Sequence, residues 1–412
     1  MSAAAQAEFA PIEATRRQVA ETVAACVAEL CSREFGRRLR ALVLTGSFAR
    51  DEASICAGPT GYRVLGDAEF LVVFRRSARL PGAGRMSEFA HAASEALAAK
   101  GVACAVHLAA VHPAYLQRLP PHIFSYELRA QGRVVWGERG ILGLAPEYYP
   151  AEIEKEDAWR LLSNRLIEWL EAREACRAEG NAAAMELRYR TAKLWMDAGT
   201  SLLVFLGRYA PGYRARAERL TALALHPPAI ALPFPLARIA SAVERVTAWK
   251  LDPRFAERHA APAADEDAAW FAARLWCWEA ARLANLDAEL APRALVRAFA
   301  RKSGWRRRAR GWLHLARENG GWGSRGHWRH WRRLAASGTP RDWLYAIAAE
   351  WALTDARRAG DRGEDLVCAL RARWLRALLP IPQDGTPAET ESAALAGEIA
   401  RQYHQFVETT RA

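Results

Sequence analysis

The chain has 412 residues, of which 51% are hydrophobic and 25% are charged, and its formal net charge is +12. This balance excludes a disordered chain and predicts two or three folded domains, while the positive charge favours acidic partners such as nucleotides, nucleic acid or an anionic membrane surface. The seven cysteines are scattered and include no C-x-x-C pair, which argues against a zinc site and predicts buried thiols in a reducing compartment.

The N-terminal residues lack the basic and apolar regions of a secretory signal. The longest apolar stretches fall far short of the ~20 residues that span a bilayer. We therefore expect a cytoplasmic protein without a transmembrane segment.

The first 150 residues alternate between helical and strand patterns. Apolar residues at three- and four-residue steps predict a helix over residues 12–35. A buried strand, a Gly-Ser turn and the start of another helix follow, at residues 41–44, 46–47 and 48–50. We then expect a loop or hairpin at residues 55–66 and a strand at residues 68–74. A helix at residues 86–100 and a third strand at residues 102–111 follow. This order predicts an α+β domain with a mixed sheet.

From residue 158 onward helix formers dominate, and no fixed-period repeat is present. Clear helical patterns cover residues 158–178, 182–206, 235–249 and 265–290. More helix is expected from residue 292 to the end, interrupted at residues 319–326 and 380–387. We therefore divide the chain into an α+β domain at 1–150, a helical domain at 151–290 and a basic, Trp-rich helical region at 291–412.

Two short motifs in the first domain carry candidate chemistry. Gly46 and Ser47 form a turn between a strand and a helix start, where backbone N–H groups and a hydroxyl can hold phosphate. Asp67 and Glu69 lie two residues apart in an apolar strand, so both carboxylates face the same side of the sheet. Two adjacent carboxylates are stable beside a cation, and Mg²⁺ binds to such a pair together with phosphate oxygens. An ordinary capped turn and two surface acids are the alternative interpretation of these motifs.

Together the motifs TGSFAR (residues 45–50) and DAE (residues 67–69) resemble the signature of the DNA polymerase beta-type nucleotidyltransferase superfamily. The resemblance covers roughly residues 12–145, including a closing segment at residues 126–137. It implies a nucleotidyltransferase-like mixed sheet, with Gly46, Ser47 and Arg50 at the nucleotide and with Asp67 and Glu69 as catalytic Mg²⁺ ligands. Nineteen residues separate Ser47 from Asp67, which indicates an insertion near the site.

Two further residues follow from the resemblance. His107 stands where the family usually carries a third acid, so it is a candidate metal ligand or base, although a structural histidine is the alternative. Residues 161–165 and 189–197 resemble the helical domain that follows the catalytic domain in bacterial relatives, including the aminoglycoside nucleotidyltransferases. That resemblance implies that the helical domain packs on the active-site cleft and makes Lys193 a candidate triphosphate ligand. A surface pair between Lys193 and Asp197 is the alternative.

The segment that begins at Arg301 and ends at Arg333 holds eleven Lys and Arg residues against one acid. Five tryptophans lie between them, at positions 305, 312, 322, 328 and 331. This composition suits nucleic acid or an anionic membrane surface, unless the tryptophans pack the helices and the arginines are merely solvated. Helical spacing of Trp312 with Leu315 and Ala316 predicts that Trp312 is buried.

The sequence thus predicts a Mg²⁺-dependent nucleotidyltransferase that moves a nucleoside monophosphate from a triphosphate to a hydroxyl acceptor. The acceptor is open, and so is the identity of the base. One alternative is a nucleotide-binding regulator or scaffold without turnover, which the histidine at position 107 favours. The other is a protein that binds nucleic acid or a membrane surface through its basic C-terminal region.

Overall fold

The computed structural model describes residues 12–58, 61–252, 266–286, 290–318, 325–355, 365–381 and 392–410. The chain divides into two compact units. Unit 1 comprises Met1–Glu154, Leu206–Thr221 and Glu244–Ala261, and unit 2 comprises Lys155–Phe205, Ala222–Val243 and Pro262–Ala412. The first division lies close to the boundary expected at residue 150. Segments 206–221 and 244–261 group with unit 1, although they were expected in the helical domain at 151–290. The second expected boundary, at residue 290, lies within unit 2.

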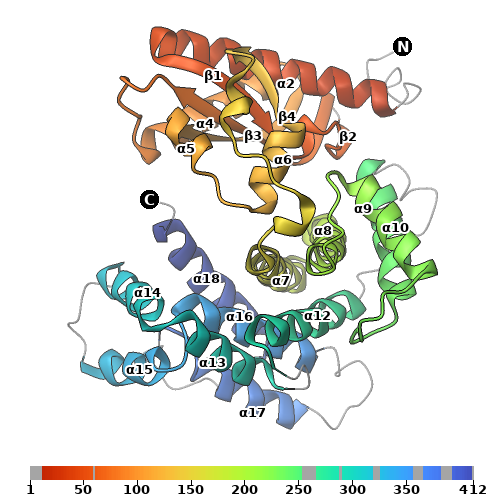
Figure 1. The fold of residues 1–412 in the computed structure, drawn as a ribbon, viewed down its shortest axis with the longest axis vertical. Helices are drawn as coiled ribbons and strands as arrows, with labels where there is room; N and C mark the ends of the chain where they lie inside the picture. Colours follow the sequence, from red (N-terminus) through yellow and green to blue (C-terminus); the bar gives the residue numbers. More distant parts are fainter. Residues whose placement is uncertain are drawn as a thin grey trace. The chain divides into compact units, whose positions relative to one another are not determined.

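Unit 1 contains a five-stranded sheet built around one long strand (Figure 1). The strands are β1 (Leu39–Thr45), β2 (Ile55–Gly58), β3 (Gly61–Phe74), β4 (Val102–Val111) and β5 (Arg133–Gly137). Along one edge, β3 pairs with β4 in parallel. Along the other edge it pairs in antiparallel fashion with β2 and then with β1, which in turn pairs with β5. The sheet is therefore mixed, and the segment expected as a loop or hairpin is the β2–β3 hairpin.

Helices cover the two faces of this sheet, and each face has its own apolar core. On one face, alternate residues of β3 such as Ala68 and Phe70 pack with α2 (Ile12–Phe35) and α4 (Ala83–Ala99). On the other face, Leu71 and Val73 pack with the short helices α5 (Pro113–Gln117), α6 (Ile123–Gln131) and η2 (Ile141–Leu144). Because side chains alternate along a strand, Asp67 and Glu69 extend the second face beyond its apolar core.

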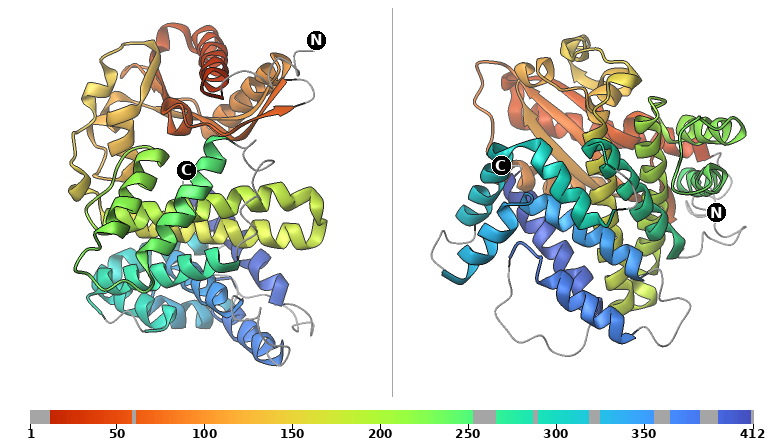
Figure 2. Two further views of the ribbon diagram at one scale, coloured as in Figure 1. Left: turned by 90° about the vertical axis from the view of Figure 1, so that its right-hand side faces the viewer. Right: turned by 60° about the horizontal axis from the view of Figure 1, so that its bottom comes forward.

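Unit 2 is helical. Its first helices, α7 (Lys155–Glu179) and α8 (Asn181–Phe205), run side by side along their length (Figure 2). Around them pack α12 (Glu266–Ala284), α16 (Pro340–Asp355) and α18 (Ser392–Thr410). The remaining helices of this unit are α13 (Pro292–Ser303), α14 (Trp305–Glu318), α15 (Arg325–Ala335) and α17 (Asp365–Arg376). Two more, α9 (Tyr213–Leu225) and α10 (Leu236–Leu251), contribute residues to both units.

The structure confirms the expected fold class, an α+β arrangement followed by a helical C-terminal region. The expected helix after the Gly-Ser turn is a single turn, α3 (Gly46–Ala49), and α9 was not expected. The interruptions expected at residues 319–326 and 380–387 lie mostly outside the described residues. None of the described helices combines the length and the apolar composition needed to cross a bilayer.

A buried carboxyl lies in the core of unit 2. Glu279 of α12 is completely buried, and neither of its carboxyl oxygens makes a hydrogen bond of normal geometry with the described residues. Burial raises the pKa of Glu279 well above its ordinary value, and the Ser201 hydroxyl of α8 offsets this only in part. The carboxyl is therefore neutral in the folded protein at pH values where it would be charged in the unfolded chain.

This burial makes the stability of the protein depend on pH. Because the folded-state pKa is raised, the contribution of Glu279 is fully present below the unfolded pKa of about 4.3 and is lost as pH rises towards the folded pKa. Glu279→Gln should remove this loss. The free energy of unfolding of the variant, relative to that of wild type, should therefore increase by up to about 1.4 kcal/mol for each unit of rising pH. Urea denaturation between pH 5 and pH 8 measures this difference in stability. Glu179→Gln is the control, because Glu179 is exposed. Parallel stability profiles of wild type and Glu279→Gln would contradict the expectation.

Candidate functional site

The Gly-Ser turn is held in place by its backbone geometry and its buried neighbours. Thr45 ends β1 in an extended conformation, and Gly46 then adopts a φ of +65°, which a residue with a side chain rarely occupies. Phe48 and Ala49 are buried beneath the turn, and the Ser47 carbonyl accepts a hydrogen bond from the Glu52 N–H at 2.8 Å. Since α3 is only one turn long, any phosphate contact here would come from this turn and the Ser47 hydroxyl.

Glu69 lies directly against the turn. In the antiparallel pairing of β1 and β3, Glu69 is opposite Thr45, whose hydroxyl donates to the Glu69 carbonyl at 3.3 Å. A Cβ atom added to Gly46 would come within 2.6 Å of the Glu69 Oε2. The absence of a side chain at position 46 therefore makes room for the carboxylate. The structure thus brings together the two motifs that the sequence separates by nineteen residues.

His107 and Asp67 complete this end of the sheet face. In the parallel pairing of β3 with β4, His107 is beside Glu69. Its Nε2 lies 3.4 Å from Asp67 Oδ2, and the two side chains are 68% and 41% exposed. A protonated imidazole would form an ion pair with Asp67, whereas a neutral one could accept a proton or bind a metal. The site therefore presents two carboxylates and one imidazole to solvent.

Helix α6 borders the site through a small hollow of about 60 Å³. Gly46 and Glu69 line it on the sheet side, and Phe124, Glu127 and Gln131 line it on the α6 side. A water molecule occupies about 30 Å³ in the liquid, so this space suits one or two waters rather than a nucleotide. A bound nucleoside triphosphate would have to lie over the open sheet face, where Asp67 and His107 are exposed.

A larger hollow lies beyond Phe124, which lines both spaces. It measures about 490 Å³ and is lined mainly by apolar residues of β4, α5 and the start of α6. Tyr115 and Phe124 expose about two fifths of their surface, at 44% and 39%, and Arg118 supplies a cation. Among the described residues, the buried His112 Nδ1 has no hydrogen-bond partner. The unit therefore has space for a small molecule in a hollow that shares Phe124 with the hollow at Glu69.

Arg50 belongs to a largely buried ion network rather than to the exposed face. Its guanidinium contacts Glu127 at 2.6 Å and Glu52 at 3.0 Å, and its side chain is 5% exposed. Burial alone would lower the pKa of Arg50, but the charge of Glu127 and the contact with Glu52 outweigh it and raise the pKa. As it stands, Arg50 braces the Gly46 turn against α6, and its predicted contact with a nucleotide stays a prediction.

The same network holds the segment 206–221 to unit 1. Arg216 contacts Glu127 at 2.9 Å, and the Tyr209 hydroxyl donates to Glu127 at 2.5 Å. The N–H of Tyr213 donates to Glu52 at 2.7 Å. The sequence interpretation missed Glu52, Glu127, Tyr209 and Arg216, because the contacts to Glu127 join residues 77 to 89 positions apart. No local pattern marks such contacts.

Lys193 lies in unit 2, in a polar cluster between α7 and α8. Its ammonium is 5.4 Å from the centre of the Tyr189 ring. Asp197, the expected partner in a simple surface pair, instead accepts from Arg165 at 2.6 Å. Burial and the neighbouring Arg165 charge lower the pKa of Lys193, although Glu168 and Asp197 counteract them. The role of Lys193 at a triphosphate stays a prediction.

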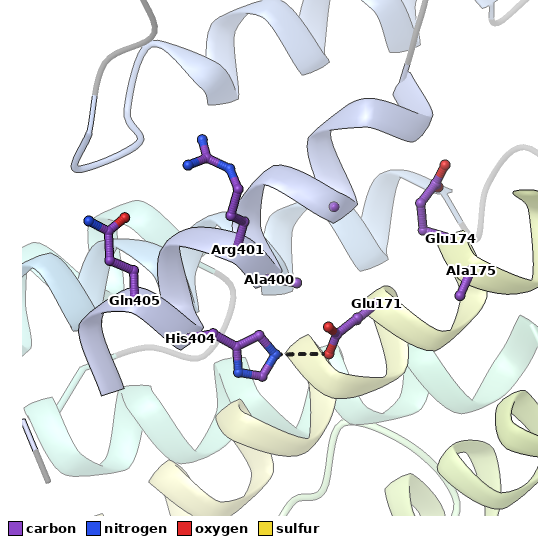
Figure 3. A pocket seen from close by; sticks show the side chains of 8 residues that line it. Glu171, Glu174, Ala175, Ala400, Arg401, His404 and Gln405 are labelled. Atoms are coloured by element: carbon purple, nitrogen blue, oxygen red, sulfur yellow. Dashed lines mark hydrogen bonds and ion pairs between the residues drawn. The ribbon is translucent and has the colours of Figure 1, made fainter. Parts of the chain in front are cut away.

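Unit 2 also has a shallow hollow of about 550 Å³ between α7 and α18 (Figure 3). The dashed line in Figure 3 joins His404 Nε2 to Glu171 Oε2 at 3.0 Å. Its other charged groups are also paired, Glu174 with Arg177 at 3.6 Å and Arg401 with Glu398 at 2.6 Å. The pair between His404 and Glu171 joins α18 to α7, whereas the other two pairs each lie within one helix. None of the residues predicted as site residues lines this hollow.

The described residues contain no group of three or more His, Cys, Asp or Glu side chains arranged to hold a metal ion. A cation at Asp67 and Glu69 would thus have two carboxylates from the protein and would need oxygen ligands from water or substrate. Comparison with protein-family models, with curated proteins and with solved structures gave no significant match. The functional assignment therefore depends on the site itself.

Gly46→Ala tests how closely the turn and Glu69 are fitted together. Gly207→Ala is a matched control, because Gly207 has the same φ of +65° but no atom within 4 Å of the added Cβ. Each change should lower the stability of the protein by about 1–2 kcal/mol through backbone strain. Only Gly46→Ala should also displace the Glu69 carboxylate and weaken Mg²⁺-dependent binding of a triphosphate. Thermal denaturation and calorimetric titration measure the two effects, and equal triphosphate affinity of the two variants would contradict the fit.

Proposed function

We propose that this protein is a Mg²⁺-dependent nucleotidyltransferase that transfers a nucleoside monophosphate from a triphosphate to a hydroxyl group. The observation that carries the proposal is the Glu69 carboxylate against the Gly46 turn, with Asp67 on the same sheet face. A phosphate-binding turn beside two exposed carboxylates fits a nucleotide whose charge is shared with a cation. The motif resemblance at residues 45–50 and 67–69 agrees with this chemistry.

The residues present fit a magnesium ion. Mg²⁺ is usually held by one or two carboxylates together with substrate phosphates and waters, rather than by a complete protein cage. Asp67 and Glu69 supply that number of oxygen ligands, and their exposure lets a hydrated cation and a triphosphate reach them. When bound, the ion would neutralise charge on the phosphate oxygens.

The protein's own residues would mainly position the reactants. Ser47 and the turn would hold the terminal phosphates, while Asp67 and Glu69 would hold the ion, whose charge would help to align the α-phosphate for in-line attack. The acceptor oxygen forms a bond to the α-phosphorus, the bond from that phosphorus to the bridging oxygen breaks, and pyrophosphate leaves. His107, 3.4 Å from Asp67, is the candidate to take the acceptor's proton. The hollow beside Phe124 offers a place for a small acceptor.

A second candidate function is a nucleotide-binding regulator or scaffold without turnover. The contact between His107 and Asp67 favours it, because a protonated His107 would compete with a cation for the Asp67 carboxylate. A site with an imidazole in place of a third acid also carries less negative charge for a second Mg²⁺.

Mass spectrometry separates the two candidates. Purified protein is incubated with each labelled triphosphate and Mg²⁺ in the presence of cell extract, and the protein and the extract are then searched for an added nucleoside monophosphate. The proposed enzyme should produce such an adduct and pyrophosphate, and Asp67→Asn should not. Binding of a triphosphate without any adduct would support the regulator. If the protein neither bound a triphosphate nor produced an adduct, both candidate functions would be wrong.

A further inference from the structure

Helices α14 and α15 carry most of the basic segment, and the structure separates its structural residues from its exposed ones. The two helices pack against each other through Trp312 and Trp331, whose rings lie 6.4 Å apart and are only 5% and 4% exposed. Leu315 and Leu334 join them in an apolar core with Trp343 of α16. The expected burial of Trp312 is confirmed, and Trp322 lies outside the described residues.

Two of the arginines also serve the packing of unit 2. Arg307 contacts Glu156 of α7 at 2.7 Å and Asp342 of α16 at 3.6 Å. Arg308 donates to the carbonyl of Ala300 in α13 at 2.5 Å. Neither cation is therefore available to a ligand without loss of a structural contact.

The remaining arginines of α14 form an exposed row. Arg306, Arg310 and Arg317 are all exposed and recur at steps of four and seven residues, which places them on one side of the helix, opposite the buried apolar side. At 1.5 Å per residue these steps space the arginines about 6 and 10 Å apart along the axis. Trp305, 68% exposed, begins the helix, and the Arg306 guanidinium lies 5.8 Å from its ring centre.

Helix α15 repeats this combination. Trp328 is 47% exposed, and Arg329 and Arg332 beside it are exposed as well. Among the exposed residues that the structure describes on α14 and α15, none is acidic. We name Trp305, Arg306, Arg310, Arg317, Trp328 and Arg329 the arginine-tryptophan face.

We propose that the arginine-tryptophan face binds single-stranded nucleic acid, independently of the function proposed for unit 1. Cations in a row along a helix match a phosphate backbone, and exposed indole rings offer stacking surfaces that only unpaired bases can use. A helix that lies in a membrane surface must insert a broad apolar side into the lipid. Here the apolar side of α14 is buried in the unit, which leaves a mainly cationic side for the ligand.

The test measures the affinity of the full-length protein for a fluorescently labelled 20-nucleotide single strand by anisotropy over a series of salt concentrations. Replacing Arg306, Arg310 and Arg317 together by Gln should weaken binding at least about 10-fold at low salt and reduce the slope of log affinity against log salt by about 2. A control variant with Arg76, Arg188 and Arg219 replaced by Gln loses the same charge at exposed positions elsewhere. It should bind as wild type does, and equal loss in both variants would overturn the proposal.

A second arm tests stacking. Trp305→Ala should weaken binding by about 5- to 100-fold, and Trp305→Phe should restore most of it. Because Trp305 is exposed, both variants should melt at the wild-type temperature. Duplex of the same sequence should bind more weakly than the single strand and should be indifferent to Trp305→Ala; the opposite preference would overturn the single-strand assignment.

A third arm replaces the strand by vesicles that contain anionic phospholipid. If the triple Gln variant lost vesicle binding while it kept its affinity for the single strand, the face would be a membrane surface and the proposal would be wrong. Asp67→Asn should leave single-strand binding unchanged, so failure of this proposal can be told apart from failure of the nucleotidyltransferase proposal.

Discussion

Asp67→Asn is expected to remove Mg²⁺-dependent binding of a nucleoside triphosphate. Asp67 lies on the same sheet face as Glu69, which lies against the Gly46 turn, and an amide replaces a charged ligand by a neutral one of the same shape. We expect the affinity to fall at least about 10- to 100-fold, the range seen when the surroundings of a metal ligand are altered. Wild type treated with a chelator should lose affinity to the same extent. Calorimetric titration with and without Mg²⁺ measures both.

The control for this experiment is Glu88→Gln. Glu88 is an exposed acid of α4, the helix that packs on the opposite face of the sheet, so its loss changes the net charge equally without touching the site. It should bind the triphosphate as wild type does. If Asp67→Asn and the control behaved alike, or if the chelator had no effect on wild type, the carboxylates would not be acting as a metal clamp.

Much of the architecture of unit 1 could be predicted because it is encoded locally. The helix at residues 12–35 and the strand at residues 102–111 match α2 and β4 at both ends, since periodicity and glycine mark their limits. The two-residue spacing of Asp67 and Glu69 places both on one sheet face, as a strand requires. What brings that face to Gly46 is the pairing of β1 with β3, which the order of the strands along the chain does not define.

The division of the chain could not be predicted in the same way. Segment 206–221 belongs to unit 1 because Tyr209 and Arg216 contact Glu127, which is 82 and 89 positions away. Segment 244–261 belongs there because the Lys250 ammonium donates to the Ser54 hydroxyl at 3.1 Å, across 196 positions. Composition at these positions indicates helix, and nothing in it indicates which core the helix joins.

Burial of individual side chains was only partly predictable. Helical spacing correctly indicated that Trp312 is buried, because an apolar side repeats every three or four residues. The neighbouring arginines look alike in the sequence, yet Arg307 is held by acids of two other helices while Arg306 is exposed. Their difference depends on where Glu156 and Asp342 lie, which only the tertiary structure defines.

Glu127→Gln is the substitution that should cost unit 1 the most stability. Glu127 is a shared partner of Arg50 and Arg216, whose side chains are each 5% exposed, and its own side chain is 17% exposed. Removing the carboxylate charge leaves two nearly buried guanidinium groups, of which Arg50 keeps its contact with Glu52. Breaking a buried ion pair by removing one partner typically costs about 3–5 kcal/mol. Urea denaturation at neutral pH measures the loss.

Two further variants give the expected effect a scale. Tyr209→Phe removes one hydrogen bond to the same carboxylate and leaves its charge, so it should cost less, about 1.5–3 kcal/mol. Glu138→Gln breaks the half-exposed pair with Arg40, and its unfolding midpoint should stay close to that of wild type. The order Glu127, then Tyr209, then Glu138 follows from burial and charge together.

Because Arg50 directly follows the Gly46 turn, Glu127→Gln should also weaken triphosphate binding under conditions in which the variant is still folded, whereas Glu138→Gln should not. A stable Glu127→Gln variant with wild-type affinity would show that the network neither supports unit 1 nor positions the turn.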